Sequence, residues 1–281
     1  MNKYLVSTAV LPLCVGKNFY DYTAIAEAYK KLDIDGVEFV FLPEWDSNHA
    51  PLTPTPVDWN SVPKVEVREL VDFCIRNELS VPVVHINRDV GNMLSSENKE
   101  TILEGQKVLD ENLSGASKLG SRIAVLHMWD TYSENLDLYK IYKRVYEVTG
   151  NYKIQIAVEN LPISDKKLTQ GKVWELLESI MPSDYGFTLD LNWCSLYNNF
   201  DELKRYKDRV LHVHAHGYLA FDGENKYTLS PKVGNLDIIS KLSEFCMLGY
   251  NGYITLEMVR AKGEEDFKKA LEIIKNNTIK E

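Results

Sequence analysis

The sequence predicts a single (β/α)8 barrel over residues 1–281. Eight short runs rich in β-branched residues alternate with amphipathic stretches, a pattern typical of βα units around a parallel sheet. Eight such units in 281 residues leave about 35 residues per unit, close to what a (β/α)8 barrel uses. The competing doubly wound fold would favour a Gly-x-Gly-x-x-Gly turn after a strand, and the chain contains none.

Each element is predicted by the spacing of its apolar residues. The expected strands are Lys3–Val10, Gly36–Leu42, Val81–Ile86, Arg122–Met128, Lys153–Glu159, Tyr185–Asp190, Val210–His214 and Tyr253–Met258. The expected helices are Tyr22–Leu32, Val65–Asn77, Ser96–Leu119, Leu136–Val148, Val173–Ile180, Phe200–Tyr206, Leu236–Leu248 and Glu264–Asn276. The helical stretches carry apolar residues three and four positions apart, and Gly120 and Gly249 follow two of them, where a helix end favours glycine.

Composition excludes several classes of protein. With 44% hydrophobic and 26% charged residues, the chain is neither disordered nor fibrous. Its net charge of −9 argues against a nucleic-acid partner, and no apolar run reaches the roughly 18 residues that a membrane span needs. The segment Tyr4–Gly16 resembles the apolar part of a signal peptide, but it lacks a small-x-small cleavage site, so we expect a buried first strand. Four cysteines without a Cys-x-x-Cys pair indicate reduced thiols and a cytoplasmic protein.

The longest irregular stretch is residues 43–63, which contain five prolines, two tryptophans and His49. Since this stretch lies between a predicted strand and a predicted helix, it would form a βα loop, and such loops are often lids over a site. A rigid, proline-braced surface loop is the equally weighted alternative.

Polar side chains gather where the predicted strands end. They are Glu38, His85, His127, Glu159, Asp190, His214 and Glu257. Successive members are 24 to 47 residues apart, about one βα unit, so all seven can stand on one rim. That rim is where the active sites of (β/α)8 barrels form.

Three carboxylates on one rim repel one another. Two unit charges about 4 Å apart cost about 4 kcal/mol even at an effective dielectric constant near 20. A divalent cation bound by Glu159, Asp190, His214 and Glu257 would remove that repulsion. Their oxygen and nitrogen donors suit Mn²⁺, Co²⁺, Fe²⁺, Zn²⁺ or Mg²⁺ without choosing among them. A hydrogen-bonded polar rim without a metal is the alternative.

Five segments carry a resemblance to a known family. They are Val158-Glu159-Asn160, Thr188-Leu189-Asp190, His212-Val213-His214, Gly234-Asn235-Leu236-Asp237 and Gly249–Glu257. In order and spacing the chain resembles the xylose isomerase-like TIM barrels, which include sugar phosphate isomerases and epimerases, inosose dehydratases and endonucleases that act at abasic DNA sites. The resemblance implies one divalent ion held by the four residues above, with Glu159 and Glu257 moving the proton. It also matches Glu38, His85 and His127 to the family's residues on the second, third and fourth strands.

The chain departs from the family at three places. Trp193 stands where many members have a histidine, Ala220 stands where several ketose epimerases have an arginine, and residues 218–232 contain no histidine. A three-metal nuclease cluster therefore lacks ligands, and the acidic charge gives DNA little reason to approach.

The leading hypothesis is a metal-dependent isomerase or epimerase of a small sugar or sugar phosphate, with proton transfer through a cis-enediolate. We expect Glu38, His85 and His127 to contact substrate hydroxyls, Trp129 and Trp193 to form apolar walls, and Arg260 to hold an anionic group. A dehydratase on the same metal site is the alternative, followed by a non-catalytic sugar-binding barrel.

Two further histidines and the assembly complete these expectations. His212 is interpreted as an interior histidine, and His216 as a ligand, a substrate contact or a surface residue. Members of the family often form dimers or tetramers, so the resemblance also implies a homo-oligomer.

Overall fold

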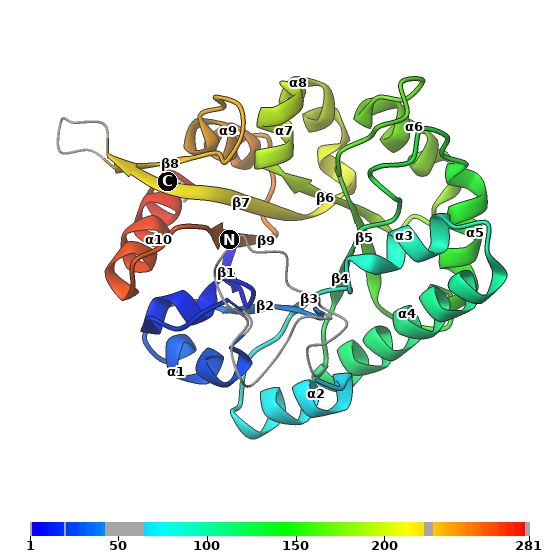
Figure 1. The fold of residues 1–281 in the computed structure, drawn as a ribbon. Coiled ribbons are helices and arrows are strands. Elements are labelled where there is room, and N and C mark those ends of the chain that lie inside the picture. Colours follow the sequence, from blue (N-terminus) through cyan, green and yellow to red (C-terminus); the bar gives the residue numbers. More distant parts are fainter. Residues whose placement is uncertain (1, 20, 43–64, 222–226, 279–281) are drawn as a thin grey trace.

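Eight parallel strands form a closed ring with helices around it (Figure 1). The computed structural model describes residues 2–19, 21–42, 65–221 and 227–278. In this part of the chain the ring runs β1-β2-β3-β4-β5-β6-β7-β9 and closes where β9 pairs with β1. The predicted single (β/α)8 barrel is therefore confirmed as the fold, whereas the loop expected at 43–63 lies outside the described residues.

All eight predicted strands are present. The ring strands are β1 (Lys3–Ser7), β2 (Gly36–Val40), β3 (Val83–His85), β4 (Ile123–Leu126), β5 (Gln155–Glu159), β6 (Gly186–Asp190), β7 (Val210–Phe221) and β9 (Tyr253–Met258). β7 extends beyond the predicted end at His214 and pairs antiparallel with β8 (Tyr227–Ser230), a strand that the sequence analysis missed. β1 is shorter than predicted, because the chain turns into η1 (Leu11–Val15).

The predicted helices are also present, with shifted ends. They are η2 (Tyr22–Ala24) with α1 (Ile25–Tyr29), α2 (Val67–Arg76), α4 (Lys99–Leu119), α5 (Leu138–Thr149), α6 (Gln170–Ile180), α8 (Phe200–Leu203) with η3 (Lys204–Arg209), α9 (Ile238–Met247) and α10 (Glu264–Thr278). Two short helices at the rim were missed, α3 (Asp89–Ser95) and α7 (Leu191–Tyr197). Seven residues make only two turns, too few for a clear apolar period.

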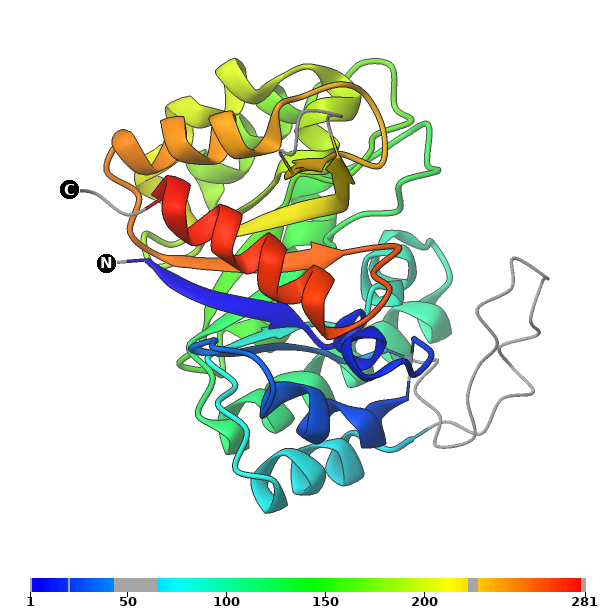
Figure 2. The same ribbon diagram turned by 90° about the vertical axis from the view of Figure 1, so that its left-hand side faces the viewer.

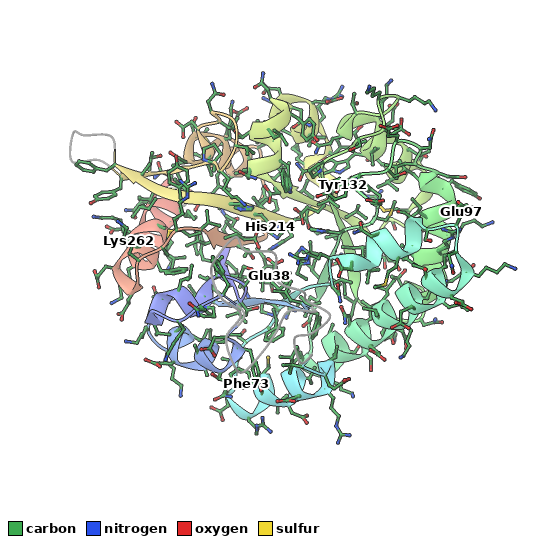
Figure 3. All side chains as sticks on the ribbon, viewed as in Figure 1. Glu38, Phe73, Glu97, Tyr132, His214 and Lys262 are labelled. Carbon is green, nitrogen blue, oxygen red and sulfur yellow. The ribbon has the colours of Figure 1, made fainter. Side chains whose placement is uncertain are left out.

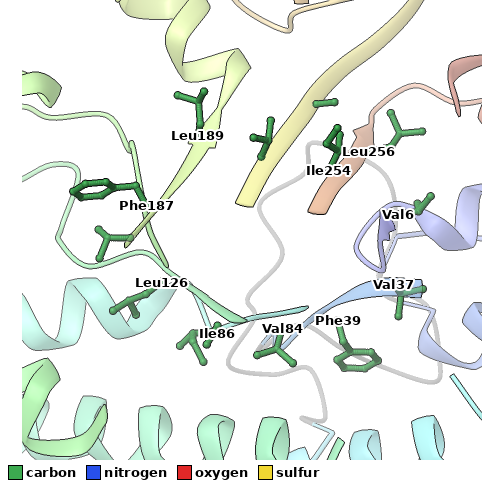
Figure 4. Packing of buried hydrophobic residues seen from close by; sticks show 14 of the residues in the cluster. Val6, Val37, Phe39, Val84, Ile86, Leu126, Phe187, Leu189, Ile254 and Leu256 are labelled. Atoms are coloured by element: carbon green, nitrogen blue, oxygen red, sulfur yellow. The ribbon is translucent and has the colours of Figure 1, made fainter. Parts of the chain in front are cut away.

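Successive side chains of each strand point to opposite faces of the sheet, and the buried apolar residues therefore form two separate cores. The larger core lies between the ring and the helices, and includes Val37, Phe39, Val84 and Leu189 (Figure 4). A smaller apolar cluster fills the barrel interior. Its buried members are Leu5, Val83, Ile123, Val125 and Ala157. Because this cluster occupies the interior, the buried polar side chains gather above it, toward the C-terminal ends of the strands.

Close contacts hold two of the helices, α10 and α3, to the ring. α10 runs along the outside of the barrel and ends near β1, where the hydroxyls of Tyr4 and Thr278 are 2.8 Å apart (Figure 2). α3 approaches the end of β4 at Gly91, where a Cβ atom would collide with the carbonyl oxygen of His127. The missing side chain thus lets α3 support the strand that leads to His127. None of the described helices is both long and apolar enough to cross a membrane.

Candidate metal centre

The rim residues expected from the sequence converge inside the ring. His85 ends β3, Glu159 ends β5, Asp190 ends β6, and His214 and Glu257 lie on β7 and β9. Strand register brings these side chains to the same height in the barrel, because Asp190 pairs with His214 across β6 and β7. His214 lies near the middle of the barrel beside Glu38 (Figure 3).

Three of the four predicted ligands surround one nitrogen atom of the fourth, His214. Nδ1 of His214 is 3.8 Å from Oε2 of Glu159, 3.7 Å from Oδ2 of Asp190 and 3.8 Å from Oε2 of Glu257. These distances exceed the roughly 3.2 Å of an N–H···O hydrogen bond. They lie within the roughly 4.4 Å that can separate two atoms bound to one ion at about 2.2 Å each.

That nitrogen also supports a metal site on its own. Nδ1 of His214 is buried and has no hydrogen-bond partner among the described residues. The imidazole's other nitrogen, Nε2, lies 3.1 Å from each oxygen of Glu38. Since a carboxylate only accepts, Nε2 carries a proton, and Nδ1 is the nitrogen that can bind a cation, either a second proton or a metal ion. Glu159, Asp190 and His214 place donor atoms close enough together to share a cation, and such carboxylate and imidazole donors fit a divalent metal ion.

Asp190 is held so that only one of its oxygens faces the centre. Its Oδ1 accepts from the backbone N–H groups of Asn192 at 2.6 Å and Trp193 at 3.0 Å, which caps α7. Asn160, fully buried after β5, accepts from the Asp190 backbone N–H at 2.6 Å and donates to its carbonyl at 3.1 Å. These bonds fix Asp190 against the end of β5 and leave Oδ2 for a ligand role. No role for Asn160 was predicted from the sequence.

Glu159 has partners on both oxygens. Oε2 lies 3.0 Å from Nε2 of His127 and 3.4 Å from Nε2 of His85, while Oε1 accepts from the indole N–H of Trp193 at 3.1 Å. Donor atoms of His85, His127 and Glu159 also lie close enough together to share a cation. The structure thus brings both predicted histidines to Glu159 and makes Trp193 a hydrogen-bond donor to a carboxylate, beyond the apolar wall that was expected.

Glu38 occupies a different place from the one expected. It lies in the middle of β2 with no exposed surface, below the rim rather than at a substrate-facing strand end. One carboxylate contacts two imidazoles, at 2.8 Å from Nε2 of His212 and 3.1 Å from Nε2 of His214. Nε2 of His212 also lies 3.1 Å from the hydroxyl of Thr255. The side chain that was expected to reach substrate therefore lies beneath the candidate metal centre.

The carboxylates around His214 stabilise a positive charge on its imidazole. Burial opposes ionisation, yet the neighbouring His214 and His212 hold the pKa of Glu38 well below its usual value. Burial also opposes the cationic form of His214, but Glu38 and Glu257 keep its pKa well above the usual value. For His212 burial prevails and its pKa is lowered. The field therefore favours a cation, whether proton or metal, at the His214 imidazole.

Two other predicted substrate contacts lie in different surroundings, one in the core and one on the surface. Trp129 is buried in the core at 1% exposure, and its indole N–H donates to the carbonyl of Pro162 at 3.0 Å, so its side chain does not line an open wall. Arg260 is exposed, and its guanidinium lies 5.0 Å from the ring centroid of Tyr218. An aromatic residue just after a strand can face either the site or the helical layer, and the ring of Trp129 lies in the core.

Fold and site together define a (β/α)8 barrel with a candidate carboxylate–histidine metal centre at its rim. The chain belongs to the xylose isomerase-like TIM barrel family, whose profile matches residues 26–277. It is 27% identical over 226 residues to an uncharacterized protein of Methanocaldococcus jannaschii, covering 74% of this chain and 75% of that protein.

Solved structures share the fold across nearly the whole chain. A D-tagatose 3-epimerase-like protein superposes with a TM-score of 0.62 at 21% identity, covering 98% of this chain and 96% of that one. A D-allulose 3-epimerase from Methylomonas sp. superposes with a TM-score of 0.67 at 15% identity over the same shares of the two chains. The 3-keto-D-glucoside 4-epimerase of E. coli covers 98% of this chain and 100% of its own, with a TM-score of 0.62 at 15% identity.

Proposed function

We propose that this protein is a divalent-metal-dependent isomerase or epimerase of a small sugar or sugar phosphate. One observation carries the proposal: three carboxylate oxygens lie 3.7–3.8 Å from Nδ1 of His214, which has no hydrogen-bond partner in the described part of the chain. The names of the structural neighbours, which are epimerases of D-tagatose type, D-allulose and a 3-keto-glucoside, support a carbohydrate substrate. The four free, buried cysteines support a reducing compartment such as the cytoplasm.

Glu159, Asp190, His214 and Glu257 would hold the ion. Bound there, a divalent ion would polarise the carbonyl and adjacent hydroxyl of a sugar and acidify the C–H bond of the carbon that carries this hydroxyl. Proton transfer itself falls to the protein's carboxylates, because a carboxylate placed beside the reacting carbon can accept and return a proton.

The two glutamates differ in their freedom to act. The side chain of Glu257 is 18% exposed, whereas that of Glu159 is 3% exposed and has partners on both oxygens. We assign Glu257 the role of the more accessible base. The contacts of Glu159 hold its carboxylate in one orientation. Two bases on opposite faces of the same carbon would produce epimerisation. His127, with a side chain 25% exposed, is the better placed of the two Glu159-bound histidines to reach a substrate hydroxyl.

Glu38 positions the metal-binding histidine. By accepting from Nε2 of His214, its carboxylate selects the tautomer whose Nδ1 is free and fixes the ring between β2 and β7. Carboxylates that accept from the far nitrogen of a ligating histidine raise its basicity and orient it. His212 occupies the remaining face of the same carboxylate, and so completes its hydrogen bonding in the barrel interior.

The proposal is tested by metal analysis and solvent exchange. The purified protein is analysed for bound metal, then incubated in heavy water with ketoses, aldoses, inososes and their phosphates. We expect about one divalent ion per chain and deuterium at the carbon beside the carbonyl of at least one recovered sugar and its epimer. Chelation should abolish exchange and added Mn²⁺ should restore it. A deoxy product formed with loss of water would indicate the dehydratase instead, and metal binding without any exchange would contradict both enzymes.

Replacing Trp193 by Phe tests the restraint on Glu159. The change keeps an aromatic ring but removes the indole N–H that donates to Oε1 at 3.1 Å. We expect kcat to fall about tenfold, since one hydrogen bond to a charged group contributes about 1.5 kcal/mol. Steady-state kinetics checks this, with the metal affinity measured alongside. An unchanged kcat would show that Trp193 serves only as a wall.

A further inference from the structure

His216 takes no part in the function proposed above, although it lies beside the same carboxylates. Side chains alternate along a strand, so His212, His214 and His216 all point to the inside of the barrel from β7. Their side chains become more exposed toward the rim, at 0%, 1% and 15%. His216 is therefore one step closer than His214 to the side from which a ligand enters.

The imidazole of His216 approaches the two carboxylate oxygens that also face His214. Its Nδ1 is 3.2 Å from Oδ2 of Asp190 and 3.5 Å from Oε2 of Glu257. Strand register enforces this, because His216 pairs directly with Glu257 across β7 and β9. Nδ1 of His214 lies 3.7 and 3.8 Å from those same two oxygens. Two imidazole nitrogens thus flank one pair of carboxylate oxygens.

We propose that His216 is a second imidazole ligand, which makes the centre a site of two histidines and three carboxylates. The inference rests on the proposed metal centre and extends it by one donor and by the choice of metal. A second nitrogen donor moves a site's preference away from Mg²⁺ and Mn²⁺, which favour oxygen ligands, toward Zn²⁺ and Co²⁺. Such a site is expected to bind Zn²⁺ or Co²⁺ in preference to Mg²⁺.

The alternative role for His216 predicts the opposite change. If His216 were a protonated counter-ion for Asp190 and Glu257, its positive charge would repel a bound cation. Its removal would then strengthen metal binding. If it is a ligand, its removal weakens binding, and weakens it more for Zn²⁺ than for Mn²⁺. The direction of the change in affinity therefore separates the two roles.

The test compares the apo-forms of the wild-type protein, H216A and H216N by competition with a chromophoric chelator. We expect both variants to lose at least about tenfold in Zn²⁺ affinity and less in Mn²⁺ affinity. Pulsed EPR of the Cu²⁺-loaded proteins should detect two coordinated imidazoles in the wild type and one in each variant. Y218F, which changes a residue two positions further along β7, is the matched control and should bind both metals as the wild type does. Circular dichroism and thermal melts check that each variant is folded.

Separate outcomes would overturn the inference and the proposed function. H214A should lose metal binding. If it does, two results would overturn the role of His216 alone. One is unchanged or stronger Zn²⁺ binding in folded H216A and H216N, and the other is a single coordinated imidazole in the wild type. A wild-type protein that binds none of Zn²⁺, Mn²⁺ and Co²⁺ would overturn the metal centre, and with it the proposed function.

Discussion

Replacing Glu257 by Gln is expected to lower kcat at least about a thousandfold, the effect typical of removing a general base. The amide keeps the size of the side chain but cannot accept the proton. A thousandfold loss corresponds to about 4 kcal/mol of transition-state stabilisation. Because Glu257 is the most exposed of the three carboxylates, the variant is expected to fold normally. Epimerisation kinetics with the sugar found by the exchange assay measure the loss.

Solvent exchange distinguishes loss of a base from loss of the metal. If Glu159 and Glu257 act on opposite faces, the Glu257→Gln variant should still exchange deuterium into one of the two epimers, through Glu159. The bound metal content must be measured in the same samples. E265Q, on the exposed face of α10, is the matched control, since the Glu265 side chain is 89% exposed. A variant that retains more than a tenth of wild-type kcat would contradict the assignment of Glu257.

Replacing Glu38 by Gln is expected to lower the free energy of unfolding by about 3 kcal/mol or more, as for other buried charged pairs that lose one partner. The glutamine amide would present N–H donors where two imidazole Nε2 atoms already donate. With His214 less firmly oriented, metal affinity should also fall about tenfold to a hundredfold. Urea unfolding in the presence of chelator gives the first quantity, and isothermal titration of the metal gives the second.

The unfolding and titration measurements on Glu38→Gln distinguish an effect on folding from an effect on the orientation of His214. E104Q, an exposed change on α4, is the control for handling and should match the wild type in both measurements. If Glu38→Gln loses stability but binds metal as tightly as the wild type, Glu38 supports the barrel without positioning His214. A loss of stability below about 1 kcal/mol would show that the buried contacts are dispensable.

Much of the architecture could be predicted because it depends on local patterns. A strand buried on both faces is a short run such as Val83–His85, and a covering helix repeats its apolar residues every three or four positions, as α2 does. The closed ring then places strand ends on one rim, which is why Glu159 and Asp190 were predicted to meet. β8 escaped prediction because it forms only where the far end of β7 leaves the ring and offers an edge.

Depth within the barrel could not be predicted from the same patterns. Glu38 and His85 both looked like strand-end polar residues, yet only His85 ends its strand, whereas Glu38 lies inside the ring. The difference comes from register: Glu38 pairs with Val83, two residues before His85, so it lies lower in the barrel. The direction of the Trp129 ring could not be predicted either, because it depends on burial in the core and on a carbonyl acceptor for the indole N–H.

The sequence by itself determined the barrel, and it predicted four residues for a metal site on one rim, because their order along the chain follows the order of the strands. Only the tertiary structure decided which atoms meet: Glu38 beneath His214, Trp193 on Glu159 and His216 beside Asp190. The physical reason is that strand identity is local, whereas strand stagger and side-chain direction are set by partners 26 to 176 residues away.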